Sequence, residues 1–188
     1  MSMSGLGELI SLVDEAVAKD TVGETVEAIK GELCRLIRSG RIDLPPELTR
    51  PIEGRYARRL LHRDDERGYS IVVMAWGPGQ RTPIHDHSGM WCVEGVWGGS
   101  IDVQQYELSE SGDSGGVRFE PRNSYEAGVG SAGCLIPPYE YHSISNACEK
   151  TTAVSLHIYG GEMSCCNVFE RQKDGTYVRR EKPLPYDN

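Results

Sequence analysis

The segment Gly79-Gln80-Arg81-Thr82-Pro83-Ile84-His85-Asp86-His87 is the most informative stretch of this 188-residue chain. His85 and His87 are two positions apart, and residues with that spacing on a β-strand point to the same face. Two imidazoles on one face can share a metal ion, because neutral imidazole is the commonest metal ligand among side chains. The spacing therefore predicts a metal site whose third ligand comes from another part of the chain.

The third histidine of the predicted site is His142, which follows the turn signal Pro137-Pro138. Gly79, five residues and His85-x-His87 resemble the opening of the first cupin motif. The segment from Pro137 to Asn146 resembles the second motif, with Tyr139 where that motif usually has glycine. Together the two segments imply the cupin fold, a small jelly-roll β-barrel of mainly β class, with a metal bound inside by His85, His87 and His142.

One position departs from the usual cupin pattern. An ordinary cupin has a glutamate four or five residues after the second histidine, and Trp91 and Cys92 stand there in this chain. We therefore expect a site of three histidines without a carboxylate, unlike the two-histidine, one-carboxylate triad of many iron oxygenases. Three neutral imidazoles leave a divalent metal its full charge, which suits an anionic substrate that becomes a ligand.

The hydrophobic pattern changes from about Arg55. Apolar residues before it recur at helical spacing in two stretches, with Thr21 and Glu24 as a capping box for the second. Short β-rich runs separated by turn residues follow it, which is typical of a sandwich or barrel: residues 70–76, 91–97, 100–106, 133–136, 152–159, 166–170 and 176–179. We expect a single cupin domain over residues 1–188, with N-terminal α-helices in residues 1–45 and the β-barrel in residues 46–188.

Composition limits the classes of partner. The chain has 20 basic and 28 acidic residues and a net charge of −8, which argues against nucleic acid and anionic membranes as partners. No apolar run is long enough to cross a membrane, and the first residues lack the features of a secretory signal. None of the six cysteines forms a C-x-x-C pair. We expect a cytoplasmic protein with free thiols, and no segment specifies an oligomeric state.

Three segments together resemble the cysteine dioxygenase family of thiol dioxygenases. They are Tyr56-Ala57-Arg58-Arg59-Leu60-Leu61, Ile84-His85-Asp86-His87 and Ser155-Leu156-His157-Ile158-Tyr159. The similarity runs from about Arg55 to Glu170, which is most of the predicted barrel. It implies an oxidoreductase of cysteine catabolism that uses Fe(II) and O2 to oxidise L-cysteine to cysteine sulfinate.

The resemblance also implies a role for each residue of the predicted site. His85, His87 and His142 would bind Fe(II). In the first segment, Arg58, with Tyr56 beside it, would bind the carboxylate of a small thiol-carboxylate substrate. In the third segment, Tyr159 would present its hydroxyl to the thiolate or oxygen. His157 would orient Tyr159, with Ser155 behind it. Cys92 stands where some family members carry a cysteine that forms a thioether bond with the tyrosine matching Tyr159.

The substrate stays open between two thiols. Gly160-Gly161 looks like the 3-mercaptopropionate dioxygenases, which usually have glutamine in place of Arg58 and no cysteine in place of Cys92. Arg58 and Cys92 favour cysteine. A non-catalytic metal-binding cupin sensor is a further alternative, although it needs neither Arg58 nor the segment 155–159, and a cupin sugar isomerase would require the missing glutamate.

Overall fold

Two antiparallel helices open the chain. The computed structural model describes residues 3–111 and 116–187. Helix α1 spans Leu6–Val17, α2 spans Val22–Arg38, and a short α3 spans Pro46–Thr49. The predicted capping box is confirmed: the Thr21 hydroxyl accepts from the backbone N–H of Glu24, and the Glu24 side chain accepts from the backbone N–H of Thr21.

Eleven strands among the described residues form two sheets. The first has the order β1-β2-β9-β4-β7, and the second closes on itself in the order β10-β11-β6-β5-β8-β3. The strand bounds of the first sheet are β1 (Ala57–Asp64), β2 (Tyr69–Trp76), β9 (Ala153–Tyr159), β4 (Cys92–Gly98) and β7 (Ala132–Leu135). Those of the second are β3 (Ile84–His85), β5 (Ser100–Ser111), β6 (Val117–Gly128), β8 (His142–Asn146), β10 (Cys165–Arg171) and β11 (Tyr177–Pro183).

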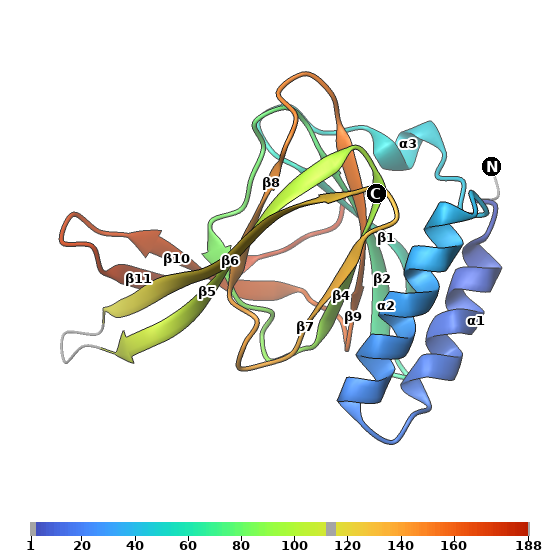
Figure 1. The fold of residues 1–188 in the computed structure, drawn as a ribbon, viewed down its shortest axis with the longest axis horizontal. Coiled ribbons are helices and arrows are strands. Elements are labelled where there is room, and N and C mark those ends of the chain that lie inside the picture. The colour runs from blue at the N-terminus through green and yellow to red at the C-terminus, as the bar shows by residue number, and fades with distance from the viewer. Residues whose placement is uncertain (1–2, 112–115, 188) are drawn as a thin grey trace.

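The helices cover the outer face of the first sheet (Figure 1). Apolar residues of α1 and α2, such as Leu9 and Leu33, form one buried cluster with Ile71, Val93 and Leu156 of the sheet. Helix α2 approaches β4 so closely that a Cβ on Gly95 would lie 2.7 Å from a methyl group of Leu33. A side chain at residue 95 would therefore have to displace the fully buried Leu33.

The inner face of the same sheet lines the barrel. Every residue of β9 is buried, because its two faces meet two different interiors. Val154, Leu156 and Ile158 face the helices, whereas Ser155, His157 and Tyr159 alternate with them and face inward. The polar face of this strand is thus buried inside the barrel.

The long hairpins β5–β6 and β10–β11 extend away from the helices (Figure 1). The predicted mainly β barrel with N-terminal helices is confirmed. Strands β1, β6 and β8 were not predicted. Strand β1 is rich in charged residues, most of β6 is exposed, and β8 has Ile144 as its single apolar residue, so none of the three shows apolar alternation. Within the described residues, no helix has the length and apolar character needed to cross a membrane.

Candidate metal centre and substrate cavity

Strand pairing brings the third histidine to the first two. Strand β3 lies between β8 and β10, and His85 is paired directly with His142 across the β3–β8 ladder. These histidines are 57 residues apart in the chain. The site therefore depends on a long-range antiparallel pairing that local sequence does not specify.

The three predicted ligands face one another. One donor nitrogen from each of His85, His87 and His142 lies within 4.8 Å of the other two. The Nε2 atoms of His85 and His142 are 3.1 Å apart. All three side chains are buried, and burial lowers the pKa of each imidazole, most strongly for His87 and His142. The histidines are therefore neutral at pH 7, which is the form that binds metal.

Hydrogen bonds around the H-x-H motif hold its orientation. His85 Nδ1 lies 3.1 Å from the Pro83 carbonyl, which places the proton on Nδ1 and leaves a lone pair on Nε2. Asp86 points the opposite way, and its carboxylate accepts hydrogen bonds from the backbone and side chain of Asn167 at 2.9 and 2.7 Å. Asp86 thus ties the motif to β10 while its neighbours face inward.

The residues present fit a metal ion. The Nε2 atoms of His85 and His142 face each other at 3.1 Å, a spacing that a shared metal ion can bridge. The Nδ1 atoms of His87 and His142 are buried and have no hydrogen-bond partner among the described residues. A set of imidazoles without thiolate suits several divalent metals, including iron, so the donor set by itself does not select one.

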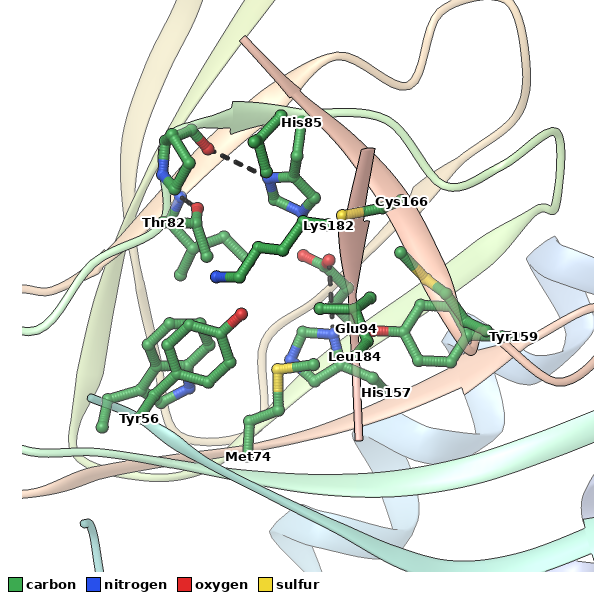
Figure 2. Close-up of a pocket in the computed structure, with 15 residues that line it drawn as sticks. Tyr56, Met74, Thr82, His85, Glu94, His157, Tyr159, Cys166, Lys182 and Leu184 are labelled. Atoms are coloured by element: carbon green, nitrogen blue, oxygen red, sulfur yellow. Dashed lines mark hydrogen bonds and ion pairs between the residues drawn. The ribbon is translucent and has the colours of Figure 1, made fainter. Parts of the chain in front are cut away.

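A buried carboxylate that was not predicted at the site also lies near the histidines. Glu94 is 7% exposed. Its Oε1 lies 3.5 Å from His142 Nε2 and 3.4 Å from His157 Nδ1, as the close-up of the pocket shows for His157 (Figure 2). Glu94, Cys92 and His87 form a second set of donor atoms within 4.8 Å of one another.

The signal for Glu94 was present in the sequence. Cys92 and Glu94 are two residues apart on β4, so they share the inward face. Glu94 lies seven residues after His87, which is outside the cupin position four or five residues after the second histidine. A glutamate side chain is long enough to turn back along the strand, and its Oε1 approaches the Cys92 sulfur to 3.9 Å.

A hydrogen-bonded chain supports His157. The Trp76 indole N–H donates to the Ser155 hydroxyl at 2.9 Å, and that hydroxyl lies 2.8 Å from His157 Nε2. Since the indole can only donate, Ser155 is free to donate its own hydrogen to Nε2, which leaves the His157 proton on Nδ1, facing Glu94. The two ring nitrogens of His157 therefore face Ser155 and Glu94, while its ring stacks on Tyr159 with centroids 6.0 Å apart.

Cys92 and Tyr159 are direct partners across β4 and β9. Both are buried, and burial raises the pKa of the thiol and of the phenol well above their ordinary values. Both groups are therefore protonated at neutral pH. The Tyr159 ring also lies near the site, with its centroid 6.0 Å from that of His87.

A cavity opens beside the histidines (Figure 2). Its wall includes His85, Glu94, His157 and Tyr159. Tyr56 and Lys182 also line it, and the Lys182 ammonium lies 5.7 Å from the centre of the Tyr56 ring. The cavity thus carries an acidic side chain near the histidines and a basic side chain on another part of its wall.

Arg58 lies behind this wall. It is 2% exposed, and its two terminal nitrogens donate to the backbone carbonyls of Leu184 at 2.8 Å and Met163 at 2.7 Å. Its guanidinium stands 4.5 Å from the ring centre of Tyr186 and 6.0 Å from that of Tyr159. Met163 and Leu184 both line the cavity, so Arg58 anchors two segments of the cavity wall.

The Gly160-Gly161 pair has a packing reason. A Cβ on Gly160 would lie 2.3 Å from the indole nitrogen of Trp91, and the Gly160 N–H donates to the Trp91 carbonyl at 3.0 Å. Any side chain at residue 160 would displace Trp91, which immediately precedes Cys92. This glycine is therefore required by its tryptophan neighbour whatever the substrate is.

Known proteins resemble this chain over the barrel. It is 22% identical over 118 residues to cysteine dioxygenase type 1 of Danio rerio, and the match covers 63% of this chain and 57% of that protein. The human cysteine dioxygenase type 1 matches with the same identity and coverage. The chain therefore spans a little over half of the length of these relatives.

Solved structures are similar at low sequence identity. The protein TT1209 from Thermus thermophilus is 18% identical, with a TM-score of 0.48, over 64% of this chain and 96% of that one. An RmlC-like cupin protein from Desulfovibrio desulfuricans is 18% identical, with a TM-score of 0.44, over 63% of this chain and 93% of that one.

The model of the family described as cysteine dioxygenase type I matches residues 52–172. This stretch begins before Arg58 and ends after Tyr159, so it includes the three histidines, Cys92 and the Ser-x-His-x-Tyr segment. It covers more than half of the chain, and the chain therefore belongs to the cysteine dioxygenase type I family.

Proposed function

We propose that this protein is a thiol dioxygenase that oxidises L-cysteine to cysteine sulfinate with Fe(II) and O2. The observation that carries the proposal is the buried three-histidine cluster beside Cys92 and Tyr159 in a chain of this family. The reaction adds both atoms of O2 to one thiol and yields a sulfinic acid, so no other reductant is needed. The product stands two steps up the thiol oxidation ladder.

His85, His87 and His142 would hold the iron. Fe(II) bound there would supply the redox chemistry that joins O2 to the thiolate sulfur. The protein keeps the three imidazoles neutral by burying them, and the Pro83 carbonyl fixes the tautomer of His85. These features support a centre that is ready to bind metal without a proton first being lost from the histidines.

Tyr159 is the proposed hydrogen-bond donor to the reacting atoms. Burial raises the pKa of its phenol, so its hydroxyl keeps its proton at neutral pH. A donor in a buried site is worth more than one in water, because water does not compete for the acceptor. We assign His157 and Ser155 to positioning Tyr159, through the ring stack and the chain of hydrogen bonds from Trp76.

Arg58 and Tyr56 are the proposed substrate-binding residues. Arg58 brings a positive charge to within 6.0 Å of the Tyr159 ring centre. A guanidinium has five N–H donors, and the carbonyls of Leu184 and Met163 engage one on each terminal nitrogen. Donors therefore remain for a carboxylate. Lys182 is a second cation on the cavity wall.

We favour cysteine over 3-mercaptopropionate as the substrate. Arg58 and Cys92 support cysteine, and the packing of Gly160 against Trp91 gives one glycine of the Gly160-Gly161 pair a reason that is independent of the substrate. 3-Mercaptopropionate is the second candidate. We place the reaction in the cytoplasm, because the six cysteines are all unpaired and free thiols persist in reducing compartments.

Oxygen uptake by the iron-loaded protein tests the proposal. The panel of thiols is cysteine, 3-mercaptopropionate and cysteamine, and products are identified by mass as sulfinates. We expect the highest kcat/KM for cysteine and little turnover of cysteamine, which lacks the carboxylate. Absence of uptake with every thiol would favour a non-catalytic metal-binding protein, and a preference for 3-mercaptopropionate would move the substrate to the second candidate.

A further inference from the structure

We propose that a second pocket, on the outer side of the cavity wall, binds the carboxylate of the incoming thiol, and that Lys182 passes this carboxylate inward. This entry step rests on the proposed function, because it concerns the same anionic substrate. Lys182 lies on β11, beyond residues 52–172 over which the chain matches the family model. The entry site therefore includes a part of the chain that the family resemblance does not cover.

The outer pocket shares a wall with the cavity beside the histidines. Arg55 and Arg58 line only the outer pocket, whereas Tyr56, Lys182 and Leu184 line both spaces. The outer pocket has a volume of about 220 Å³, which is room for several water molecules and hence for a small acid. A molecule that passed from it between the three shared side chains would arrive beside the histidines.

The outer pocket is cationic, although the net charge of the chain is −8. Arg55, Arg58 and Lys182 bring three positive charges to its lining. Asp187 lies next to them: its Oδ1 is 2.5 Å from a terminal nitrogen of Arg55, and its Oδ2 accepts the backbone N–H of Arg58 at 2.9 Å. One carboxylate offsets one of the three charges, so the remaining two attract a small anion.

Donors in the outer pocket lack acceptors. Arg58 Nε is buried and has no hydrogen-bond partner among the described residues. The Lys182 ammonium makes no hydrogen bond or ion pair within the described part of the chain, and its contact is the Tyr56 ring, whose centre is 5.7 Å away. Because a buried donor without a partner is costly, a carboxylate in this pocket would supply the missing acceptor.

Lys182 is the most flexible of the three shared side chains. The Tyr56 ring packs against that of Trp76 with centroids 4.5 Å apart, and Leu184 stands between two prolines, which restrict the backbone. Lysine carries its charge on a flexible four-carbon stem. Figure 2 shows this side chain extending across the cavity toward Tyr56. Lys182 can therefore hold a carboxylate on either side of the wall.

A titration without any thiol tests the outer pocket. Propionate has the carboxylate of 3-mercaptopropionate but no sulfur, and in the metal-free full chain it has no metal to bind. Amide resonances are followed by two-dimensional NMR as sodium propionate is added, with sodium chloride at equal ionic strength as the reference. Lys182→Met removes the proposed contact. Lys173→Met is the matched control, because it removes the same charge from an exposed residue of the connection between β10 and β11.

We expect propionate, but not chloride, to shift the Leu184 amide resonance in a saturable way in the wild type and in Lys173→Met. Lys182→Met should bind propionate more than about tenfold more weakly, the equivalent of one lost charge-assisted hydrogen bond. No saturable shift in the wild type, or equal affinity of the wild type and Lys182→Met, would overturn the proposal. The titration involves no thiol oxidation, so failure of the proposed function would be seen separately in the oxygen-uptake assay.

The iron-loaded protein provides a kinetic test of the same step. 3-Mercaptopropionate is a net anion at neutral pH, whereas cysteine is a zwitterion whose ammonium Lys182 repels. Lys182→Met should therefore lower kcat/KM about threefold to tenfold for 3-mercaptopropionate and less for cysteine, and added salt should shrink the difference. A loss no larger than that of Lys173→Met would show that Lys182 has no part in substrate entry.

Discussion

Replacement of Arg58 by alanine should destabilise the folded protein as well as impair turnover. The guanidinium donates two buried hydrogen bonds to backbone carbonyls, at 2.8 Å to Leu184 and 2.7 Å to Met163. A hydrogen bond that involves a charged group contributes about 1.5–3 kcal/mol, so the two together contribute about 3–6 kcal/mol. In Arg58→Ala both carbonyls lose their partner in the interior of the barrel.

Thermal unfolding of the metal-free protein measures this effect. For a chain of this size each 1 kcal/mol changes Tm by about 2–4 °C, so Arg58→Ala should lower Tm by roughly 6–24 °C. Arg59→Ala is the control. Arg59, which follows Arg58 on β1, also donates to two backbone carbonyls, those of Leu48 and Arg50. Because Arg59 is only part-buried, its replacement should lower Tm by a few degrees at most.

The two roles of Arg58 separate when activity is assayed at a temperature where the variant is folded. Per mole of bound iron, kcat/KM for cysteine should fall about tenfold to a hundredfold or more, the equivalent of one lost charge-assisted hydrogen bond. Arg58→Gln should impair cysteine more than 3-mercaptopropionate. If Arg58→Ala lowers Tm no more than Arg59→Ala does, Arg58 does not anchor the cavity wall. If Arg58→Ala leaves the kinetics unchanged on every thiol, Arg58 does not bind the substrate.

Four further outcomes follow from the site. Alanine in place of His85, His87 or His142 should abolish both iron binding and turnover, and full iron retention by His142→Ala, measured by metal analysis, would contradict the three-histidine assignment. Lys182→Met should lower kcat/KM for carboxylate thiols less than Arg58→Ala does, and the reverse order in the uptake assay would make Lys182 the main carboxylate reader. A thioether between Cys92 and Tyr159 should accumulate with turnover and lower the mass of the linked peptides by two hydrogens, while Cys92 that stays alkylatable in denatured protein after many turnovers would exclude the bond. Burial raises the pKa of Cys166 to about 11, so at pH 8 about one Cys166 thiol in a thousand is ionised. Alkylation of Cys166 should therefore be slow until the pH approaches 11. Hydrogen bonds from Thr151 and its neighbour lower the pKa of Cys148. Cys148 should therefore react first in a pH series followed by peptide mass, and equal rates for the two thiols would contradict this order.

The local sequence pattern was sufficient to predict several features of the structure. Alternation on a strand put His85 and His87 on one face, and it did the same for Ser155, His157 and Tyr159. The strand predicted over residues 152–159 corresponds closely to β9, which spans Ala153–Tyr159. The second helix was predicted with its cap because the capping box needs only residues three positions apart. In each case the physical cause acts within a few residues of chain.

Strand β6 could not be found in the same way. Its pairing with β5 extends over most of its length, but its mostly exposed residues show no apolar period. Backbone hydrogen bonds to a neighbouring strand hold it in the barrel, and those bonds are independent of side-chain type. A strand of this kind is visible only once the partner strand is in place.

The sequence by itself determined the class of the fold, the shared face of His85 and His87 and the alternation of Ser155, His157 and Tyr159, because residue spacing along a helix or strand decides which side chains share a face. Tertiary structure alone decided the environment of Glu94 and the partners of Arg58. Glu94 reaches the histidines because the folded barrel brings β4 and β8 together. Arg58 is held by carbonyls 105 and 126 residues further along the chain. Contacts at such separations depend on how the whole barrel closes, so the local spacing of apolar and polar residues does not predict them.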